Sequence, residues 1–124
     1  MTDIEKRNIE KTYYWAEAWN NDPMRMCDDC YAEDCKVYHM LGDVVQNNRE
    51  ELRKMEKWLY EEVDPTRNLT ITAITAFGNR VATEVDISWR GGAKIAKGTI
   101  WLTFNDEGMI IQDNTYMLDH SKED

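Results

Sequence analysis

The sequence lacks long apolar runs and any leader-like start. No window comes near 18 uninterrupted apolar residues, and the opening Met-Thr-Asp-Ile-Glu-Lys-Arg has no apolar segment after a basic one. We therefore expect a cytoplasmic protein with no membrane as a partner.

Positive charge is also in short supply. Fifteen Lys and Arg stand against 24 Asp and Glu, which gives a formal net charge of −9, and the basic residues are scattered singly among acids. A surface of this kind repels phosphate backbones and anionic membranes. Nucleic acid is therefore not an expected partner.

Cysteine is too scarce for a disulfide framework. The three cysteines lie within nine residues, an odd count that favours reduced thiols. The spacing Cys27-x2-Cys30-x4-Cys35-x3-His39 is close to that of a zinc knuckle. A helix running through Cys27 and Cys30 would prevent the tight turn of a knuckle, so we expect no metal site and treat zinc as an alternative.

The first half of the chain has helical patterns. Residues 3–21 contain neither Gly nor Pro and carry apolar residues at three- and four-residue steps, which predicts a first helix. Asp22-Pro23 suits an N-cap and first helical position, so a short helix is expected over about 23–32. Asn48 and Glu51 form a potential capping box for a third helix that ends before Asp64-Pro65.

The second half has strand patterns. From Leu69 onward the apolar period is two, and turn signals at 78–79, 91–92 and 105–108 divide the segment into four strands. Short turns predict an antiparallel meander. A short strand is expected around Cys35–His39, and the polar tail from His120 to Asp124 is expected to fray. The prediction is one α+β domain spanning residues 1–124.

This order of elements resembles a known superfamily. With Trp19-Asn20-Asn21-Asp22, Tyr31-Ala32-Glu33-Asp34 and Phe104-Asn105-Asp106-Glu107-Gly108, it is similar to the nuclear-transport-factor-like superfamily, above all its SnoaL-like and ketosteroid-isomerase branches. The resemblance implies a cone, a roll of curved antiparallel sheet wrapped around the N-terminal helices, with an apolar cavity open at one end. It also implies pairing of two subunits through the outer sheet face, where Trp101 is expected. We expect a homodimer.

The resemblance also supplies candidate catalytic residues. Tyr14 takes the place of an oxyanion-donating tyrosine on the first helix, but the second donor of the isomerases is replaced by Ile100. The isomerase general base falls on His39, and the last strand directs Asp113 inward, as a base itself or as the residue that orients His39. The alternatives are a half-buried structural histidine and a one-residue slip that exposes Asp113 and turns Tyr116 inward.

Large apolar side chains are candidates for the wall of the cavity. Ordinary core packing is the alternative for each of them singly. The candidates are Trp15, Trp19, Met55, Trp58, Leu59, Val85, Ile87, Trp89 and Ile100.

The functional expectation is cofactor-independent acid/base chemistry. The resemblance implies an isomerase, cyclase or dehydratase/lyase acting on a small hydrophobic carbonyl compound, such as a steroid- or polyketide-like molecule. The alternative is a module of the same fold that binds a hydrophobic ligand or a protein without catalysis.

Overall fold

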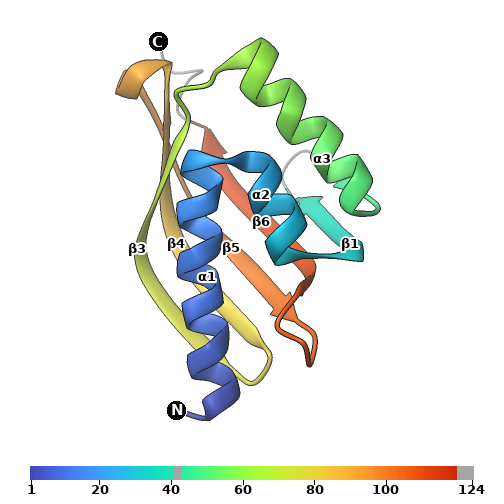
Figure 1. Cartoon of the computed structure of the whole chain (residues 1–124). Coiled ribbons are helices and arrows are strands. Elements are labelled where there is room, and N and C mark those ends of the chain that lie inside the picture. The colour runs from blue at the N-terminus through green and yellow to red at the C-terminus, as the bar shows by residue number, and fades with distance from the viewer. Residues whose placement is uncertain (41–42, 120–124) are drawn as a thin grey trace.

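The computed structural model describes residues 1–40 and 43–119 and has an α+β architecture, with helices against one face of a curved sheet (Figure 1). The tail 120–124, expected to fray, lies outside the described residues. The helical elements are α1 (Asp3–Asn21), α2 (Pro23–Cys30), α3 (Arg49–Trp58), a π-helical turn (Leu59–Val63) and a 3-10 turn (Arg90–Gly92). The strands are β1 (Tyr31–His39), β2 (Val44–Gln46), β3 (Asn68–Phe77), β4 (Arg80–Trp89), β5 (Lys94–Phe104) and β6 (Ile110–Asp119).

Two of the helix starts confirm the capping signals in the sequence. The Asp22 side chain accepts a hydrogen bond from the Arg25 backbone N–H, and Pro23 occupies the first turn of α2. Asn48 caps α3 by accepting from the Glu51 N–H at 2.8 Å. The Glu51 side chain accepts from the backbone N–H of Asn47 rather than from that of Asn48, so the capping box closes one residue early.

The six strands are ordered β2-β1-β6-β5-β4-β3. Strands β3 to β6 form the predicted antiparallel meander, and β1 joins β6 in parallel. The sheet is therefore mixed rather than wholly antiparallel. Parallel neighbours need a long connection, and here β2, α3 and strands β3 to β5 lie between β1 and β6 in the sequence.

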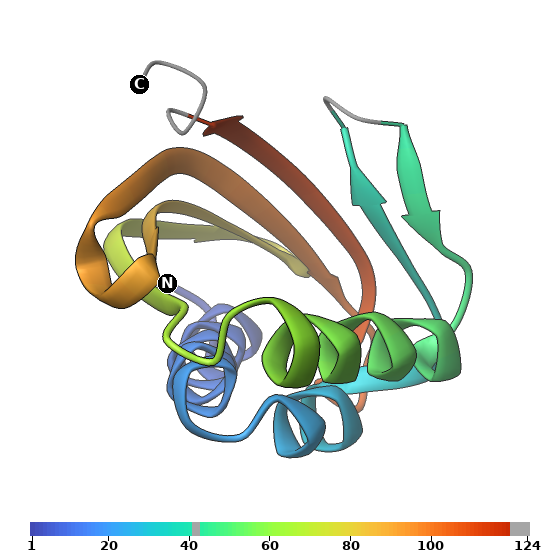
Figure 2. The same cartoon turned by 90° about the horizontal axis from the view of Figure 1, so that it is seen from above.

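The sheet curves over the helices without closing (Figure 2). Register shifts interrupt the β1–β6, β3–β4 and β5–β6 pairings, and such bulges bend strands and increase their twist. Gly98 in β5 allows a close approach, since a Cβ there would lie 2.2 Å from the backbone oxygen of Tyr116. The concave face holds α1, while α3 crosses one end of the sheet (Figures 1 and 2).

The core lies between the helices and the concave face of the sheet. Alternate residues of β4, namely Val81, Thr83 and Val85, are buried, as the period-two pattern predicts. The three cysteines are free thiols packed in this core. Burial raises the pKa of Cys30 to about 12 and that of Cys35 to about 11.

Residues 1–40 and 43–119 contain neither a metal-binding cluster nor a membrane-spanning helix. No group of three or more His, Cys, Asp or Glu side chains is placed to hold a metal ion there. None of the helices in that part of the chain is both long and apolar enough to span a membrane.

Candidate functional site

A cavity of about 180 Å³ lies between the concave face of the sheet and helices α1, α2 and α3. Most of its wall is apolar, and the apolar residues that line it are Trp15, Trp19, Met26, Val37, Leu52, Met55, Leu59, Ile87, Ile100 and Met117. Six polar residues interrupt this wall: Tyr31, His39, Glu56, Arg67, Asp113 and Thr115. A few polar groups in an apolar hollow are the usual composition of a small-molecule site.

Asp113 lies at the centre of a buried hydrogen-bond chain. Its side chain faces inward from β6 and is only 3% exposed. Tyr31 donates its hydroxyl proton to Asp113 Oδ2 at 2.7 Å, and Thr115 donates to Oδ1 at 2.7 Å. Trp15 Nε1–H in turn donates to the Tyr31 hydroxyl at 3.0 Å. The carboxyl group is thus fixed in position on both oxygens.

Burial changes the pKa values of Asp113 and Tyr31, the two ionisable groups of this hydrogen-bond chain. Removal from water raises the pKa of Asp113 above its usual 3.8, and the charge of Glu56 acts in the same direction. The hydrogen bonds from Tyr31 and Thr115 and the charge of His39 oppose that rise without cancelling it. Burial and the Asp113 charge also raise the pKa of Tyr31. Asp113 is therefore a carboxyl group whose pKa is moved toward neutrality, as general acids and bases require.

His39 reaches the same cavity from the end of β1. Val37 and His39 share a face of this strand, and the parallel register pairs them with Asp113 and Thr115. The imidazole Nε2 lies 3.0 Å from Gln46 Oε1 on β2. The hydrogen-bond partner of His39 is therefore Gln46, whereas an orienting role for Asp113 would need a hydrogen bond between Asp113 and the imidazole.

Glu56 and Arg67 form an ion pair in the wall. Arg67 Nη2 lies 2.8 Å from Glu56 Oε2, and the two side chains are 17% and 6% exposed. The Arg67 guanidinium also stacks on the Trp19 ring, with 4.5 Å between Cζ and the ring centroid. The cavity therefore contains a second polar cluster apart from the Asp113 chain.

The sequence left open whether Asp113 or Tyr116 faces inward on the last strand. Asp113 is buried and Tyr116 is exposed on the other face of β6, so the one-residue slip is wrong. Of the nine candidate wall residues, six line the cavity: Trp15, Trp19, Met55, Leu59, Ile87 and Ile100. Val85 is buried in the neighbouring core, and Trp89 is half-buried at the end of β4; neither is among the lining residues.

Trp58 is the third wall candidate that lies outside the cavity. It is 57% exposed, because the inward line of α3 runs through Leu52, Met55, Glu56 and Leu59. These positions follow the i, i+3, i+4, i+7 spacing of one helix face. Sequence reasoning passed over Glu56 in that line, because a charged residue does not extend an apolar stripe.

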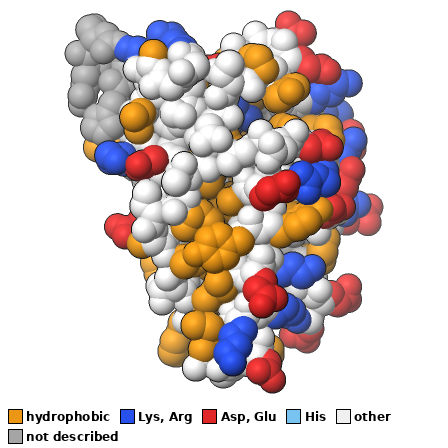
Figure 3. Space-filling model, turned by 60° about the vertical axis from the view of Figure 1, so that its left-hand side comes forward, with side chains coloured by type: hydrophobic (Ala, Val, Ile, Leu, Met, Phe, Trp, Pro, Cys, Tyr) orange, Lys and Arg blue, Asp and Glu red, His pale blue; other side chains and the backbone are white. Residues whose placement is uncertain are grey.

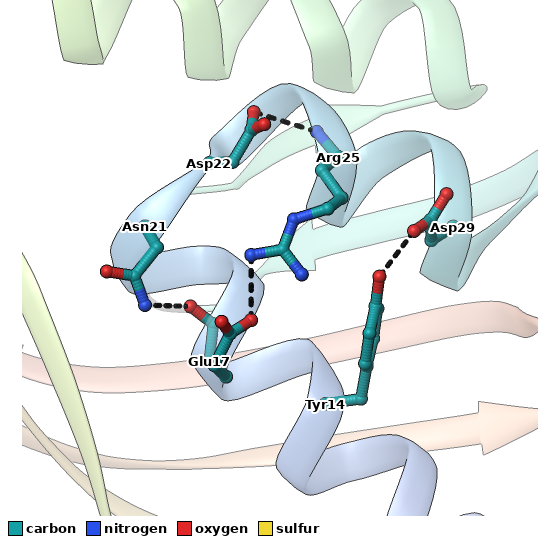
Figure 4. Close-up of polar contacts among 6 residues, drawn as sticks. All are labelled: Tyr14, Glu17, Asn21, Asp22, Arg25 and Asp29. Carbon is teal, nitrogen blue, oxygen red and sulfur yellow. Dashed lines mark hydrogen bonds and ion pairs between the residues drawn. The ribbon is translucent and has the colours of Figure 1, made fainter.

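Tyr14 does not reach the cavity, which corrects its expected role there. Tyr14 is 41% exposed, because the adjacent Trp15 faces inward on α1 and Tyr14 therefore points to the side of the helix. The Tyr14 hydroxyl donates to Asp29 of α2 at 2.5 Å, and Arg25 pairs with Glu17 beside it (Figure 4). Tyr14 instead lines an open, charged hollow between α1 and α2.

The tyrosine that does enter the cavity is Tyr31, which sequence reasoning placed only in a family motif. It begins β1, at the point where α2 ends, and this junction turns its ring into the core. Arg67 was missed because it lies in a polar loop before β3. The sequence carries no signal that joins Tyr31 to Asp113, because their contact depends on the pairing of β1 with β6, and none marks Arg67.

The comparisons with known proteins agree with this architecture. A protein of Kribbella flavida, provisionally assigned as a ketosteroid isomerase, is similar with a TM-score of 0.80 and 16% identity, over 93% of this chain and 80% of that one. An LEH-like epoxide hydrolase of M. tuberculosis is similar with a TM-score of 0.75 and 15% identity, over 92% of this chain and 84% of that one. At such identities these structures show the fold alone.

A third solved structure has the same fold. It is a protein of Jannaschia provisionally assigned as a SnoaL-like polyketide cyclase, with a TM-score of 0.79 and 14% identity, over 94% of this chain and 89% of that one. Comparison with curated protein sequences gave no match. The model of the SnoaL-like domain matches residues 12–112, most of the sequence. The chain therefore belongs to the family of SnoaL-like domains.

Proposed function

We propose that this protein is a cofactor-independent enzyme that moves a proton on a small apolar carbonyl compound. The observation that carries the proposal is Asp113, a buried carboxyl group in an apolar cavity, held by Tyr31 and Thr115 and with its pKa raised. Such a group is costly to bury and is suited to proton transfer near neutral pH. The names of the similar structures, which include an isomerase, a cyclase and a hydrolase, are compatible with this chemistry.

The size of the cavity narrows the substrate. An engineered apolar cavity of about 150 Å³ holds benzene, whereas sites for drug-sized ligands measure about 300–1,000 Å³. At about 180 Å³, this cavity suits a compound with a single ring or a short branched chain. A steroid-sized substrate, which the resemblance suggested, would require the wall to open.

The proposed step uses two residues of the cavity. Ionised Asp113 removes a proton from the carbon beside the carbonyl group, and the C–H electron pair shifts to give an enolate oxygen. His39 Nε2–H, released from its Gln46 acceptor, donates a hydrogen bond to the enolate oxygen, and Asp113 then returns its proton to carbon. Return to a different carbon gives isomerisation, and loss of a leaving group from the enolate gives the lyase outcome. Tyr31 and Thr115 position the carboxyl group.

Proton exchange tests this step without knowledge of the natural substrate. In D2O, the wild-type protein should speed deuterium incorporation beside the carbonyl group of single-ring ketones, followed by NMR. We expect Asp113→Asn to abolish the acceleration and His39→Ala to reduce it by about 10²-fold or more. Asp106→Asn, in the exposed turn before β6, is the matched control and should retain it.

A binding module without catalysis is the second candidate function. The observation that favours it is Ile100, which lines the cavity where the isomerases have a second oxyanion donor. Such a module would bind the ketones in the cavity and leave their exchange rate at the value of the buffer. That result would replace the enzyme by a carrier or sensor of small hydrophobic molecules.

A further inference from the structure

Arg67 has a hydrogen-bond donor that no described residue accepts. Its Nη2 is paired with Glu56, but its Nε is buried and has no hydrogen-bond partner among residues 1–40 and 43–119. A buried donor without an acceptor is costly, and a guanidinium N–H more so than a neutral one. Stacking on Trp19 fixes the plane of the guanidinium and with it the direction of the free N–H. Arg67 lines the cavity, so a ligand bound there is the available source of an acceptor for this N–H.

The charge balance indicates what kind of acceptor fits. Glu56 already neutralises the Arg67 charge within a largely buried pair. A carboxylate ligand would bring a second negative charge beside Glu56, with one cation between them, in a site with little water. A neutral oxygen, such as that of a ketone, ether or lactone, accepts the Nε–H without this penalty.

The two polar clusters occupy different sides of the cavity. Arg67 immediately precedes β3, whereas Asp113 lies on β6, and β4 and β5 separate these strands in the sheet. Apolar side chains of β4 and β5, Ile87 and Ile100, line the cavity between them. A ligand that contacts both clusters has oxygen atoms at two ends and an apolar middle.

We propose that Arg67 is a substrate-binding residue, whose Nε–H holds a neutral acceptor oxygen at the end of the substrate remote from the reacting carbonyl group. The inference rests on the proposed function for the reacting end, and it deepens the substrate class to a small, uncharged molecule with two oxygen functions. Glu56 is a positioning residue that fixes the guanidinium.

We call the contact between Arg67 Nε–H and a ligand oxygen the anchor. A matched pair of ligands tests the anchor by binding alone. 1,4-Cyclohexanedione and 4-methylcyclohexanone are of similar size and differ in the second oxygen. We measure both dissociation constants from the indole N–H signals of Trp15 and Trp19, which lie in the cavity wall. The preference is the dissociation constant of the methyl ketone divided by that of the dione. It should fall about ten-fold or more when the Nε–H is removed.

Two variants remove that donor in different ways. Arg67→Lys keeps a positive charge beside Glu56, and Glu56→Leu/Arg67→Met replaces the pair by apolar side chains, a change that buried ion pairs often tolerate. Arg80→Met is the matched control, because Arg80 stacks on Trp101 of β5 at 4.8 Å, outside the cavity. The control should keep the wild-type preference.

Three results would overturn the anchor. They are an unchanged preference in both Arg67 variants, failure of both ketones to shift the tryptophan signals of the wild type, and tighter Arg67-dependent binding of 4-oxocyclohexanecarboxylate than of the dione. The deuterium-exchange measurement separates this inference from the proposed function. Arg67-dependent binding without exchange keeps the anchor and rejects the enzyme, while exchange with an unchanged ligand preference does the reverse.

Discussion

Asp113 is costly to bury, and it is also the residue that we propose for proton transfer. Its two neighbours, Tyr31 and Thr115, each donate a hydrogen bond, so the ionised form is partly compensated but remains less favourable than in water. Tyr31 connects this carboxyl group to the core through Trp15 Nε1–H. The position of the carboxyl group is thus set by the same side chains that pack the protein.

The raised pKa of Asp113 makes a prediction about stability. The folded protein holds the Asp113 proton more tightly than the unfolded chain, whose pKa is near 3.8. The stabilisation from the protonated form is therefore complete below that pH and is lost as the pH rises through the folded pKa. Relative to Asp113→Asn, the wild type should lose about 1.4 kcal/mol of unfolding free energy for each unit by which the pKa is raised.

Urea unfolding across this pH range measures the difference. The two proteins differ only at position 113, so the comparison isolates the Asp113 carboxyl group. Asp106→Asn, in the exposed turn before β6, is the control for the removal of a carboxyl group elsewhere on the chain. The measured quantity is the difference in unfolding free energy between the wild type and Asp113→Asn. A difference that is constant with pH, or that shifts in favour of the wild type as the pH rises, would contradict the raised pKa.

At the scale of elements, the cavity depends on how β5, β6 and α3 are bent. Gly98 brings β5 close to Tyr116 and Met117 of β6, and Met117 lines the cavity. The helical chain changes to a π-helical turn at Leu59, the last residue that α3 and this turn contribute to the wall. Local π turns often occur at functional sites. Both irregular features thus lie next to residues that line the cavity.

Gly98→Ala tests the strand contact. A Cβ at position 98 would meet backbone oxygen at 2.2 Å and Met117 Sδ at 2.4 Å, so β5 and β6 must separate. We expect a loss of roughly 3 kcal/mol or more in unfolding free energy, together with weaker ketone binding. The control Gly78→Ala has open space but a φ of +62°, and should lose only about 1 kcal/mol from backbone strain. Equal losses in the two variants would argue against the close packing of β5 on β6.

At the scale of the whole molecule, the outer face of the sheet carries exposed apolar side chains. Trp101, at 38% exposed, lies on this face of β5 as expected, with Ile95 on the same strand and Tyr116 and Leu118 on β6. Apolar side chains also gather on the side of the molecule that Figure 3 brings forward. Patches of this kind mark contact surfaces in many proteins. We propose that the outer face pairs two copies of the chain.

The dimer makes a direct prediction about mass. Light scattering after size-exclusion chromatography should give twice the 14.6 kDa of the chain. Trp101→Glu should halve that mass, because a carboxylate in the centre of an interface has no partner there. Trp58→Glu is the control, since Trp58 is 57% exposed on α3, and the helices pack against the concave face of the sheet, opposite Trp101. A monomeric wild type, or a dimer insensitive to Trp101→Glu, would reject the interface.

Local signals in the sequence predicted the elements and the register. Caps at Asp22 and Asn48 and the period-two pattern of β4 correspond to backbone rules that act over a few residues, and they were confirmed. The inward direction of Asp113 was also predictable, from the isomerase-like register that the resemblance implies, whereas alternation alone left a one-residue slip open. The parallel pairing of β1 with β6 was not, since it depends on how the chain ends meet in space.

The sequence by itself determined an α+β domain, because the period of the apolar residues distinguishes helices from strands, and its resemblance to a known superfamily indicated that a carboxyl group and an imidazole face one hollow. Only the tertiary structure decided which polar groups meet there. It excluded Tyr14 and Trp58, and it brought in Tyr31, Glu56 and Arg67. The physical reason is that hydrogen bonds and ion pairs join residues far apart in the chain, and their partners are set by packing between elements rather than by spacing within one.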